Sequence, residues 1–229
     1  MERDRGSVAV EGAAFARALE TLKREGSNVL VVGATPADAH GALCDRLCGS
    51  GGDSSAHDHD YGYSGDHSEG YHLFVTASKE RARTTAAEGA DEGSEPPAAV
   101  RSIEFADAAG DDDVPIETLG SEIIDTIGDL EADADGFEPA ELRVCVDSLV
   151  TLFQDHDAET VFRLLHITTS GVDHVNGMGH YHLALNRDHE AVSLLEPLFD
   201  AVVEVRTSGG AYEQRWHLRE QGSTAWIPL

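Results

Sequence analysis

The residues whose spacing could support chemistry begin at an apolar run, residues 28–32, that ends at Gly33. A buried strand that runs into a glycine turn and then a helix is the arrangement at which a P-loop holds a nucleotide phosphate. When the pattern G-x-x-x-x-G-K-[ST] is laid on Gly33, Asp38 falls at the second glycine. Ala39 then falls at the lysine, and His40 at the hydroxyl that binds magnesium. Because an aspartate at a helix N-terminus repels phosphate, the sequence predicts a P-loop-like turn that has lost its catalytic groups.

A second candidate position follows the apolar run 142–146, which ends in Asp147-Ser148. A strand that ends in aspartate is typical of a Walker B segment, whose carboxylate lies near magnesium at the carboxyl end of a parallel sheet. The alternative is that Asp147 caps a helical segment beginning at Ser148. Without a phosphate-binding loop the carboxylate has little to hold, so we expect no magnesium there. The candidate pocket is lined by Gly33, Asp38, His40 and Asp147.

The stretch 49–70 is a place where a metal could bind. It is rich in Gly, Ser, Asp and His, and it holds His57, His59 and His67 at short spacing among carboxylates. Imidazole and carboxylate groups that alternate in this way can coordinate transition metals. The alternative is a solvated loop that collects ions only loosely. Residues 88–98 form a second acidic loop, and we expect both loops to be flexible.

Other cysteines and histidines are explained without a metal. Cys44 and Cys48 lie four residues apart on a predicted helix, a spacing that can support ligation. With no further cysteine nearby, burial as small apolar residues explains them better. His180, His182 and His189 lie close in the sequence, and scattered polar faces explain them without a ligand set. We therefore expect no bound cofactor.

The chain is strongly negative. Its 43 acidic residues outnumber its 16 basic ones, which gives a formal net charge of −27 at pH 7. Such an imbalance destabilises a compact state in dilute buffer, whereas molar salt shortens the Debye length to about 3 Å and screens the repulsion. The acidic residues are spread over predicted helices as well as loops, which favours a halophilic, haloarchaeal protein over an ordinary acidic one with disordered segments.

Charge and hydropathy also exclude several kinds of partner. The chain has no Lys/Arg cluster, and so it lacks the basic face that contacts with nucleic acid need. No apolar run approaches the roughly 18 residues of a membrane-spanning helix, and no signal peptide opens the chain. Three cysteines give no paired disulfide framework, so we expect a reduced, cytoplasmic protein.

Apolar periodicity predicts strands and helices that alternate along the chain. Such alternation predicts a single three-layer α/β domain over residues 1–229, with a mostly parallel sheet. The tail predicts a C-terminal β-hairpin that turns at residues 221–223. The expected helices cover residues 11–25, 36–48, 78–87, 116–131, 157–175 and 188–198, and the expected strands cover residues 28–32, 71–76, 100–105, 142–149, 181–185 and 201–205.

The order of these elements resembles the RecA/KaiC superfamily of ATPases over nearly the whole chain. The residues that carry the resemblance are the strand and turn ending at Gly33, the segments 144–149 and 199–203, and the tail 218–223. More narrowly, the chain is similar to uncharacterised haloarchaeal proteins of a degenerate, transducer-like type. The resemblance implies a RecA-like fold, and domains of this type commonly assemble through their edges.

Departures from the family bear on activity. Active members place carboxylates after the second strand to polarise the attacking water, and that position falls near Thr76-Ala77, where the chain has no acid. Their tail carries a basic-x-Arg-Gly-Ser segment that reaches a neighbouring subunit's nucleotide. Here Arg219 keeps the first basic position, while Gln221 replaces the arginine. Because phosphoryl transfer depends on positioning and charge neutralisation, we expect no ATPase activity.

Three functions are open from the sequence. The first is a non-catalytic regulatory or scaffolding role, exercised through a protein partner or a homo-oligomer in a halophilic cytoplasm. The second is a sensor that binds a nucleotide or another small ligand weakly in the degenerate pocket. The third is a metal-responsive module that uses His57, His59 and His67.

Overall fold

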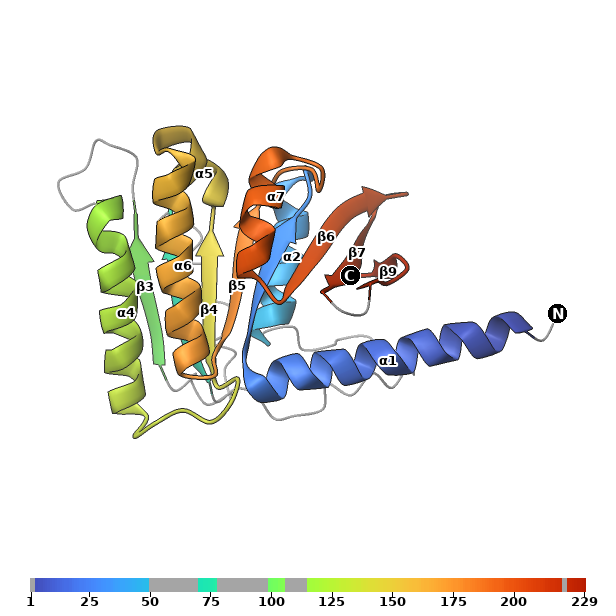
Figure 1. Ribbon diagram of the computed structural model, residues 1–229, viewed down its shortest axis with the longest axis horizontal. Helices are drawn as coiled ribbons and strands as arrows, with labels where there is room; N and C mark the ends of the chain where they lie inside the picture. The colour runs from blue at the N-terminus through green and yellow to red at the C-terminus, as the bar shows by residue number, and fades with distance from the viewer. Residues whose placement is uncertain (1–2, 50–69, 78–98, 106–114, 220–221) are drawn as a thin grey trace.

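The computed structural model describes residues 3–49, 70–77, 99–105, 115–219 and 222–229, and their strands form one sheet (Figure 1). Neighbouring strands in the order β3-β2-β4-β5-β1-β6 run parallel, and β7 follows β6 antiparallel. The short strands β8 and β9 both pair with β7. The strands are β1 (Ser27–Val32), β2 (Tyr71–Thr76), β3 (Ala99–Glu104), β4 (Leu142–Asp147), β5 (Met178–Leu183), β6 (Ala201–Ser208), β7 (Ala211–Leu218), β8 (Gly222–Ser223) and β9 (Ile227–Pro228).

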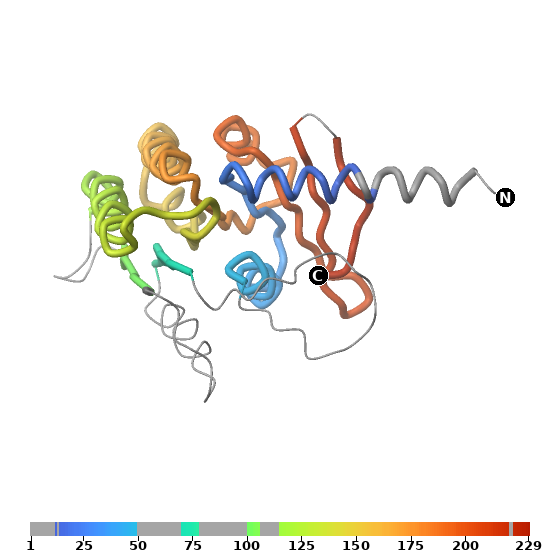
Figure 2. The backbone as a smooth tube through the Cα atoms, turned by 90° about the horizontal axis from the view of Figure 1, so that it is seen from below, coloured from blue at the N-terminus to red at the C-terminus, as the bar shows by residue number. Residues whose placement is uncertain are grey.

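Helices cover both faces of the sheet, as Figure 2 shows from below. One apolar core lies between the sheet and the helices α4 to α7, and a second lies between the sheet, α2 and part of α1. The predicted three-layer α/β domain with a mostly parallel sheet is therefore confirmed. The helices are α1 (Arg3–Glu25), α2 (Ala37–Cys48), α4 (Ile116–Asp133), α5 (Leu149–Asp155), α6 (Ala158–His174), α7 (Glu190–Leu195) and the 3-10 turn η1 (Glu196–Leu198).

Strand β1 lies inside the sheet, between β5 and β6. All six of its residues are buried. Leu30 and Val32 face the core under α4 to α7, whereas Val29 and Val31 face the core under α2. A nearly continuous apolar run is what a parallel strand covered on both faces requires. The strand ends at Val32, so the glycine turn and the start of α2 lie at the carboxyl-terminal edge of the sheet.

Two differences from the predicted elements matter. Strand β5 begins at Met178 rather than at residue 181, which brings His180 into the strand. The predicted C-terminal hairpin is present, because β8 and β9 pair antiparallel with β7, but the chain reverses between Leu218 and Gly222 rather than at residues 221–223. A longer hairpin, which joins β6 to β7 and turns at Gly209-Gly210, was not predicted. The φ angles of these glycines are 59° and 85°, and a two-residue type I′ turn needs positive φ at both central positions. The tail after β7 does fold back on it, through β8 and β9.

Some sequence predictions lie outside the described residues. These are the helix over residues 78–87, residues 50–69 and 88–98 of the acidic loops, and the histidines His57, His59 and His67. Among the helices that the structure describes, none has both the length and the apolar character that crossing a bilayer requires.

Candidate functional site

The turn after β1 is built around Gly33, whose φ is +140°. A Cβ atom on this residue would lie 2.2 Å from the backbone oxygen of Val205 on β6, so only glycine fits. The Gly33 N–H donates to the Leu185 carbonyl over 2.8 Å, and the Thr35 N–H donates to the Gly33 carbonyl over 2.9 Å. In a P-loop, backbone N–H groups of this turn cradle phosphate oxygens. Here two of these donors are bonded to carbonyls of the chain.

His40 is buried behind this turn, with 3% of its surface exposed. Its Nε2 lies 2.9 Å from the Gly33 carbonyl oxygen, and its Nδ1 lies 3.3 Å from Nδ1 of His182 on β5. The ring therefore packs inward, against the backbone that would hold a phosphate. Asp38, in the first turn of α2, is exposed. The structure thus brings Gly33 and His40 together and leaves the Asp38 side chain at the surface.

Asp147 ends strand β4, and β5 separates that strand from β1. Its backbone oxygen accepts a hydrogen bond from the Ala77 N–H, at the end of β2. The helix that follows is capped by the Ser148 hydroxyl, which accepts from the Val150 N–H over 3.3 Å. The cap predicted for Asp147 is therefore supplied by Ser148. Asp147 lies on the same sheet edge as Gly33, two strands away.

Arg219, the basic residue retained in the tail, is bonded to its own chain. Its guanidinium donates to the carbonyls of Pro197 and Phe199, each over 2.9 Å. It lines a cleft of about 540 Å³ between the segment α7–η1 and the strands β6 and β7, together with residues such as Glu196 and His217. These bonds tie the end of β7 to the turn before β6.

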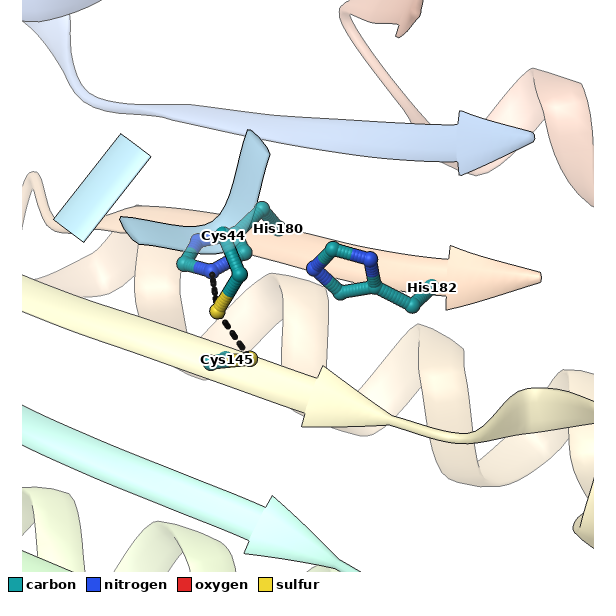
Figure 3. A group of neighbouring side chains, drawn as sticks. All are labelled: Cys44, Cys145, His180 and His182. Carbon is teal, nitrogen blue, oxygen red and sulfur yellow. Dashed lines mark hydrogen bonds between the residues drawn. The ribbon is translucent and has the colours of Figure 1, made fainter. Parts of the chain in front are cut away.

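A buried group that the sequence reasoning missed lies on the α2 side of the sheet (Figure 3). Cys44 projects from α2 toward Cys145 on β4, with 3.3 Å between the two sulfurs. The Nε2 of His180 lies 3.4 Å from the Cys44 sulfur, and His182 follows two residues later on β5. One ligand atom from each of these four residues falls within 4.8 Å of all the others. We call these four residues the Cys/His cluster.

Cys44 and Cys48 are buried as predicted, whereas the prediction that His180 and His182 lie on polar faces was wrong. Cys145 is distant from Cys44 in the sequence, but it lies opposite His180 in the register of β4 and β5. His180 and His182 are 3% and 1% exposed, so neither lies on a polar face. His189 is separate, because its side chain caps α7. The signal in the sequence was the spacing of two between the histidines, which places both on one face of a strand.

Electrostatics distinguish the three thiols. Hydrogen bonds from Cys145 and Cys48 hold the pKa of the Cys44 thiol well below its ordinary value, although burial opposes this effect. The bond to Cys44, together with burial, raises the pKa of Cys145 and of Cys48. Burial lowers the pKa of His180. The lowered pKa values of Cys44 and His180 are shifts toward the thiolate and the neutral imidazole, which are the forms that bind metals.

His72, on the neighbouring strand β2, gives a pH prediction. Burial, with smaller effects from Arg143 and His180, lowers its pKa from 6.5 to about 4. The folded state therefore resists protonation, and the stability that His72 contributes above pH 6.5 is lost as the pH falls toward 4. Between pH 7.5 and 5.5 this amounts to about 1.4 kcal/mol. We expect urea unfolding in molar KCl to show this loss in the wild type and not in His72→Phe.

The matched control for His72 is His174→Gln, which changes an exposed histidine on α6. This variant is expected to keep the wild-type dependence on pH. If the free energy of unfolding changes equally with pH in the wild type and in His72→Phe, the assignment of this effect to His72 is contradicted.

The architecture is that of the RecA/KaiC-like α/β proteins. The KaiC-like protein PH0186 from the hyperthermophilic archaeon Pyrococcus horikoshii OT3 matches with a TM-score of 0.55 and 16% identity, over 89% of this chain and 85% of that one. The uncharacterised protein PH0321 from Pyrococcus horikoshii, crystallised in complex with an unknown peptide, matches with a TM-score of 0.52 and 14% identity, over 92% of this chain and 97% of that one. At these identities the likeness shows the fold alone.

The family is shown by a direct match. The model of a family of unknown function, DUF7504, matches residues 26–205, and the chain belongs to this family. The matched region runs from the start of β1 into β6, and so it contains the Gly33 turn and the whole Cys/His cluster. None of the curated proteins matches the chain.

Proposed function

We propose that this chain is a non-catalytic RecA/KaiC-like domain that acts by binding a protein partner or a second copy of itself. The observation that carries the proposal is the contact between His40 and the turn after β1. The imidazole Nε2 lies 2.9 Å from the Gly33 carbonyl oxygen, and the N–H groups of Gly33 and Thr35 are bonded within the chain. A turn whose donors are used in this way is poorly prepared to receive a phosphate.

The missing charges support the same conclusion. The lysine position is Ala39, which is completely buried in the core beneath α2. The position where active relatives carry an acid is Thr76-Ala77, and the Ala77 N–H is bonded to the Asp147 carbonyl. The guanidinium of Arg219 is bonded to carbonyls of the same chain. Transition-state charge in phosphoryl transfer would therefore have few cations to stabilise it.

Protein binding is favoured over other roles by charge and by one structural relative. A net charge of −27 disfavours nucleic acid as the ligand of this domain. The relative PH0321 was crystallised with a peptide, and its likeness extends over 92% of this chain. RecA-like domains also assemble edge to edge, which makes a second copy of the chain a reasonable partner.

The first test is calorimetric titration of the purified chain with Mg-ATP in molar KCl. We expect no binding at micromolar affinity, because the lysine position is Ala39 and the N–H groups of Gly33 and Thr35 are already bonded within the chain. The matched variant is Asp38→Asn, which removes the exposed carboxylate at the start of α2. This variant is also expected to show no binding of Mg-ATP at micromolar affinity. Micromolar binding by the wild type would instead favour the alternative function, in which the chain is a nucleotide sensor.

The second test concerns assembly. Light scattering after size exclusion in molar KCl measures the mass of the particle, and affinity capture from a high-salt lysate of the source organism tests for a stoichiometric partner. We expect light scattering to show a dimer or a larger assembly, or affinity capture to yield a stoichiometric partner. Such a partner is expected to dissociate when the complex is diluted. A monomer that retains no partner under these conditions would contradict the proposed role.

A further inference from the structure

The Cys/His cluster joins three elements that are far apart in the sequence. Cys44 comes from α2 and Cys145 from β4. His180 and His182 lie two residues apart on β5, on the face of the strand that α2 covers. The sulfur of Cys44 lies 3.3 Å from the Cys145 sulfur and 3.4 Å from the His180 Nε2. Ligands at about 2.0–2.3 Å from a tetrahedral zinc ion lie roughly 3.3–3.8 Å from one another. The two distances from the Cys44 sulfur therefore already fall in the range found between ligands of one metal ion, and the remaining ligand atoms lie within 4.8 Å of one another.

His182 supplies the fourth ligand, and its Nε2 is a buried atom with no hydrogen-bond partner. Figure 3 shows this ring with one nitrogen directed toward the Cys44 sulfur and the other directed away. The side chain is 1% exposed, so water does not solvate the Nε2. Leaving a polar atom buried without a partner costs about 1–3 kcal/mol. Such an atom, directed at two cysteines and another imidazole, indicates a ligand that belongs there.

The tautomer of His182 follows from a chain of contacts that starts at the glycine turn. A carbonyl can only accept, so the Nε2 of His40 carries the hydrogen that it donates to the Gly33 oxygen. In a neutral ring the Nδ1 of His40 is then an acceptor, and it takes the hydrogen from the Nδ1 of His182, 3.3 Å away. The Nε2 of a neutral His182 is left with a lone pair, which is the form that binds a metal.

We propose that Cys44, Cys145, His180 and His182 bind one zinc ion in the core between α2 and the sheet. Two thiolates balance the charge of a divalent cation, and neutral imidazoles add no charge, so the bound site is electrically neutral. A neutral site is compatible with the apolar side chains of Phe74 and Val100 that surround it. A set of two sulfurs and two nitrogens in tetrahedral array is typical of zinc. Binding displaces the thiol protons of the two cysteines, and the ion then cross-links α2, β4 and β5.

Two neighbouring residues have supporting roles. Cys48 lies 3.7 Å from the His180 Nε2 and is hydrogen-bonded to Cys44, so with zinc bound it acts as a weak donor to the Cys44 sulfur rather than as a ligand. His40 is a positioning residue, because it orients His182 through the contact between their Nδ1 atoms. The residue at the former magnesium position of the P-loop thus orients a ligand of a different metal. This inference stands independently of the proposed loss of nucleotide binding.

The test uses the full chain, refolded from denaturant with a reductant in molar KCl, with zinc or cobalt(II) added alone. We expect one zinc per chain by elemental analysis after gel filtration. The cobalt form is expected to show thiolate-to-cobalt charge transfer and the intense visible bands of a tetrahedral site. Zinc is expected to abolish these bands at a ratio of one per chain.

Variants then identify the ligands. Cys145→Ser and His182→Phe are expected to lose the stoichiometric metal, whereas Cys48→Ser is expected to retain it with an unchanged cobalt spectrum. His40→Phe is expected to keep the tetrahedral spectrum and to bind zinc about 10–100-fold more weakly, as loss of an orienting partner does. Because His40→Phe retains all four ligands, it remains informative even if a ligand variant fails to fold.

Three results would overturn the proposal. The first is refolded wild-type protein that retains no zinc or cobalt against a weak competing chelator. The second is loss of metal from Cys48→Ser with retention in His182→Phe, which would define a different ligand set. The third is a disulfide between Cys44 and Cys145 in reductant-treated protein, detected by mass spectrometry after thiol blocking, because that bond would consume both sulfur ligands.

Discussion

Dilution from molar KCl toward 0.1 M is expected to unfold this protein. The cause is the net charge of −27, which a compact domain must hold within a small volume. In 1 M salt the Debye length is about 3 Å, so most pairs of surface carboxylates are screened from one another, whereas in 0.1 M salt it is about 10 Å. Self-repulsion then rises in the folded state more than in the expanded one.

The measurement is circular dichroism as a function of KCl at constant temperature and pH 7. The matched variant carries Asp125→Lys and Asp129→Lys on α4, where both side chains are exposed. Each replacement changes the charge by +2, so the net charge goes from −27 to −23. We expect the variant to unfold at a lower KCl concentration than the wild type. A melting temperature that does not depend on salt, in either protein, would contradict the electrostatic explanation.

Asn28→Asp is expected to destabilise the fold by about 3–5 kcal/mol, the cost typical of an unpaired buried charge. Asn28 is completely buried at the start of β1. Its amide nitrogen donates to the Thr169 carbonyl over 3.2 Å and to the Asp173 carboxylate over 2.6 Å. Its amide oxygen accepts from the Tyr181 hydroxyl over 2.7 Å. The backbone N–H of Asn28 donates to Asp200.

The substitution leaves the shape of the side chain unchanged and reverses its hydrogen bonding. The amide NH₂ group, which donates two hydrogen bonds, is replaced by a carboxylate oxygen, which only accepts. This carboxylate then lies against Asp173, whose own pKa is already raised by burial and by Asp200. Lowering the pH is expected to recover part of the loss, because one proton shared between two close carboxylates relieves their repulsion. Total stabilities of about 5–15 kcal/mol make a loss of this size easy to measure.

Urea unfolding in molar KCl measures the effect. The matched control is Asn186→Asp, the same change of charge at an exposed residue of the loop after β5. Surface changes of this kind usually alter stability by less than about 0.5 kcal/mol. Equal losses in the two variants would show that the network around Asn28 does not hold β1 in place.

The local elements were predictable because their causes are local. Apolar periodicity located β1, β2 and α4 to within two residues, and the glycine after α2 ends the helix in the left-handed conformation. The alternation of strands and helices then restricted the architecture to a mostly parallel sheet. The hairpin at Gly209-Gly210 was also visible in the sequence, as a glycine pair between two apolar runs, and the prediction overlooked it.

The Cys/His cluster could not be found in the same way. Cys44 lies 101 residues before Cys145 and 136 residues before His180, and the three meet only because β5 lies beside β4 and beneath α2. The order of strands in a parallel sheet is set by long-range packing, which no local pattern encodes. A prediction that started β5 at residue 181 also placed His180 outside the strand, and this concealed that His180 and His182 share one face.

The burial of Ala39 bears on whether a lysine could be accommodated at this position. This methyl group is completely enclosed among Val31, Leu43 and the other side chains of its core. A lysine at this position would have to place an ammonium group in hydrocarbon, or turn α2 about its axis and pull Cys44 away from the sheet. Replacing Ala39 alone by lysine would therefore not create an ATP site. The packing beneath α2 would first have to be rebuilt before a lysine at residue 39 could reach a phosphate at the turn after β1.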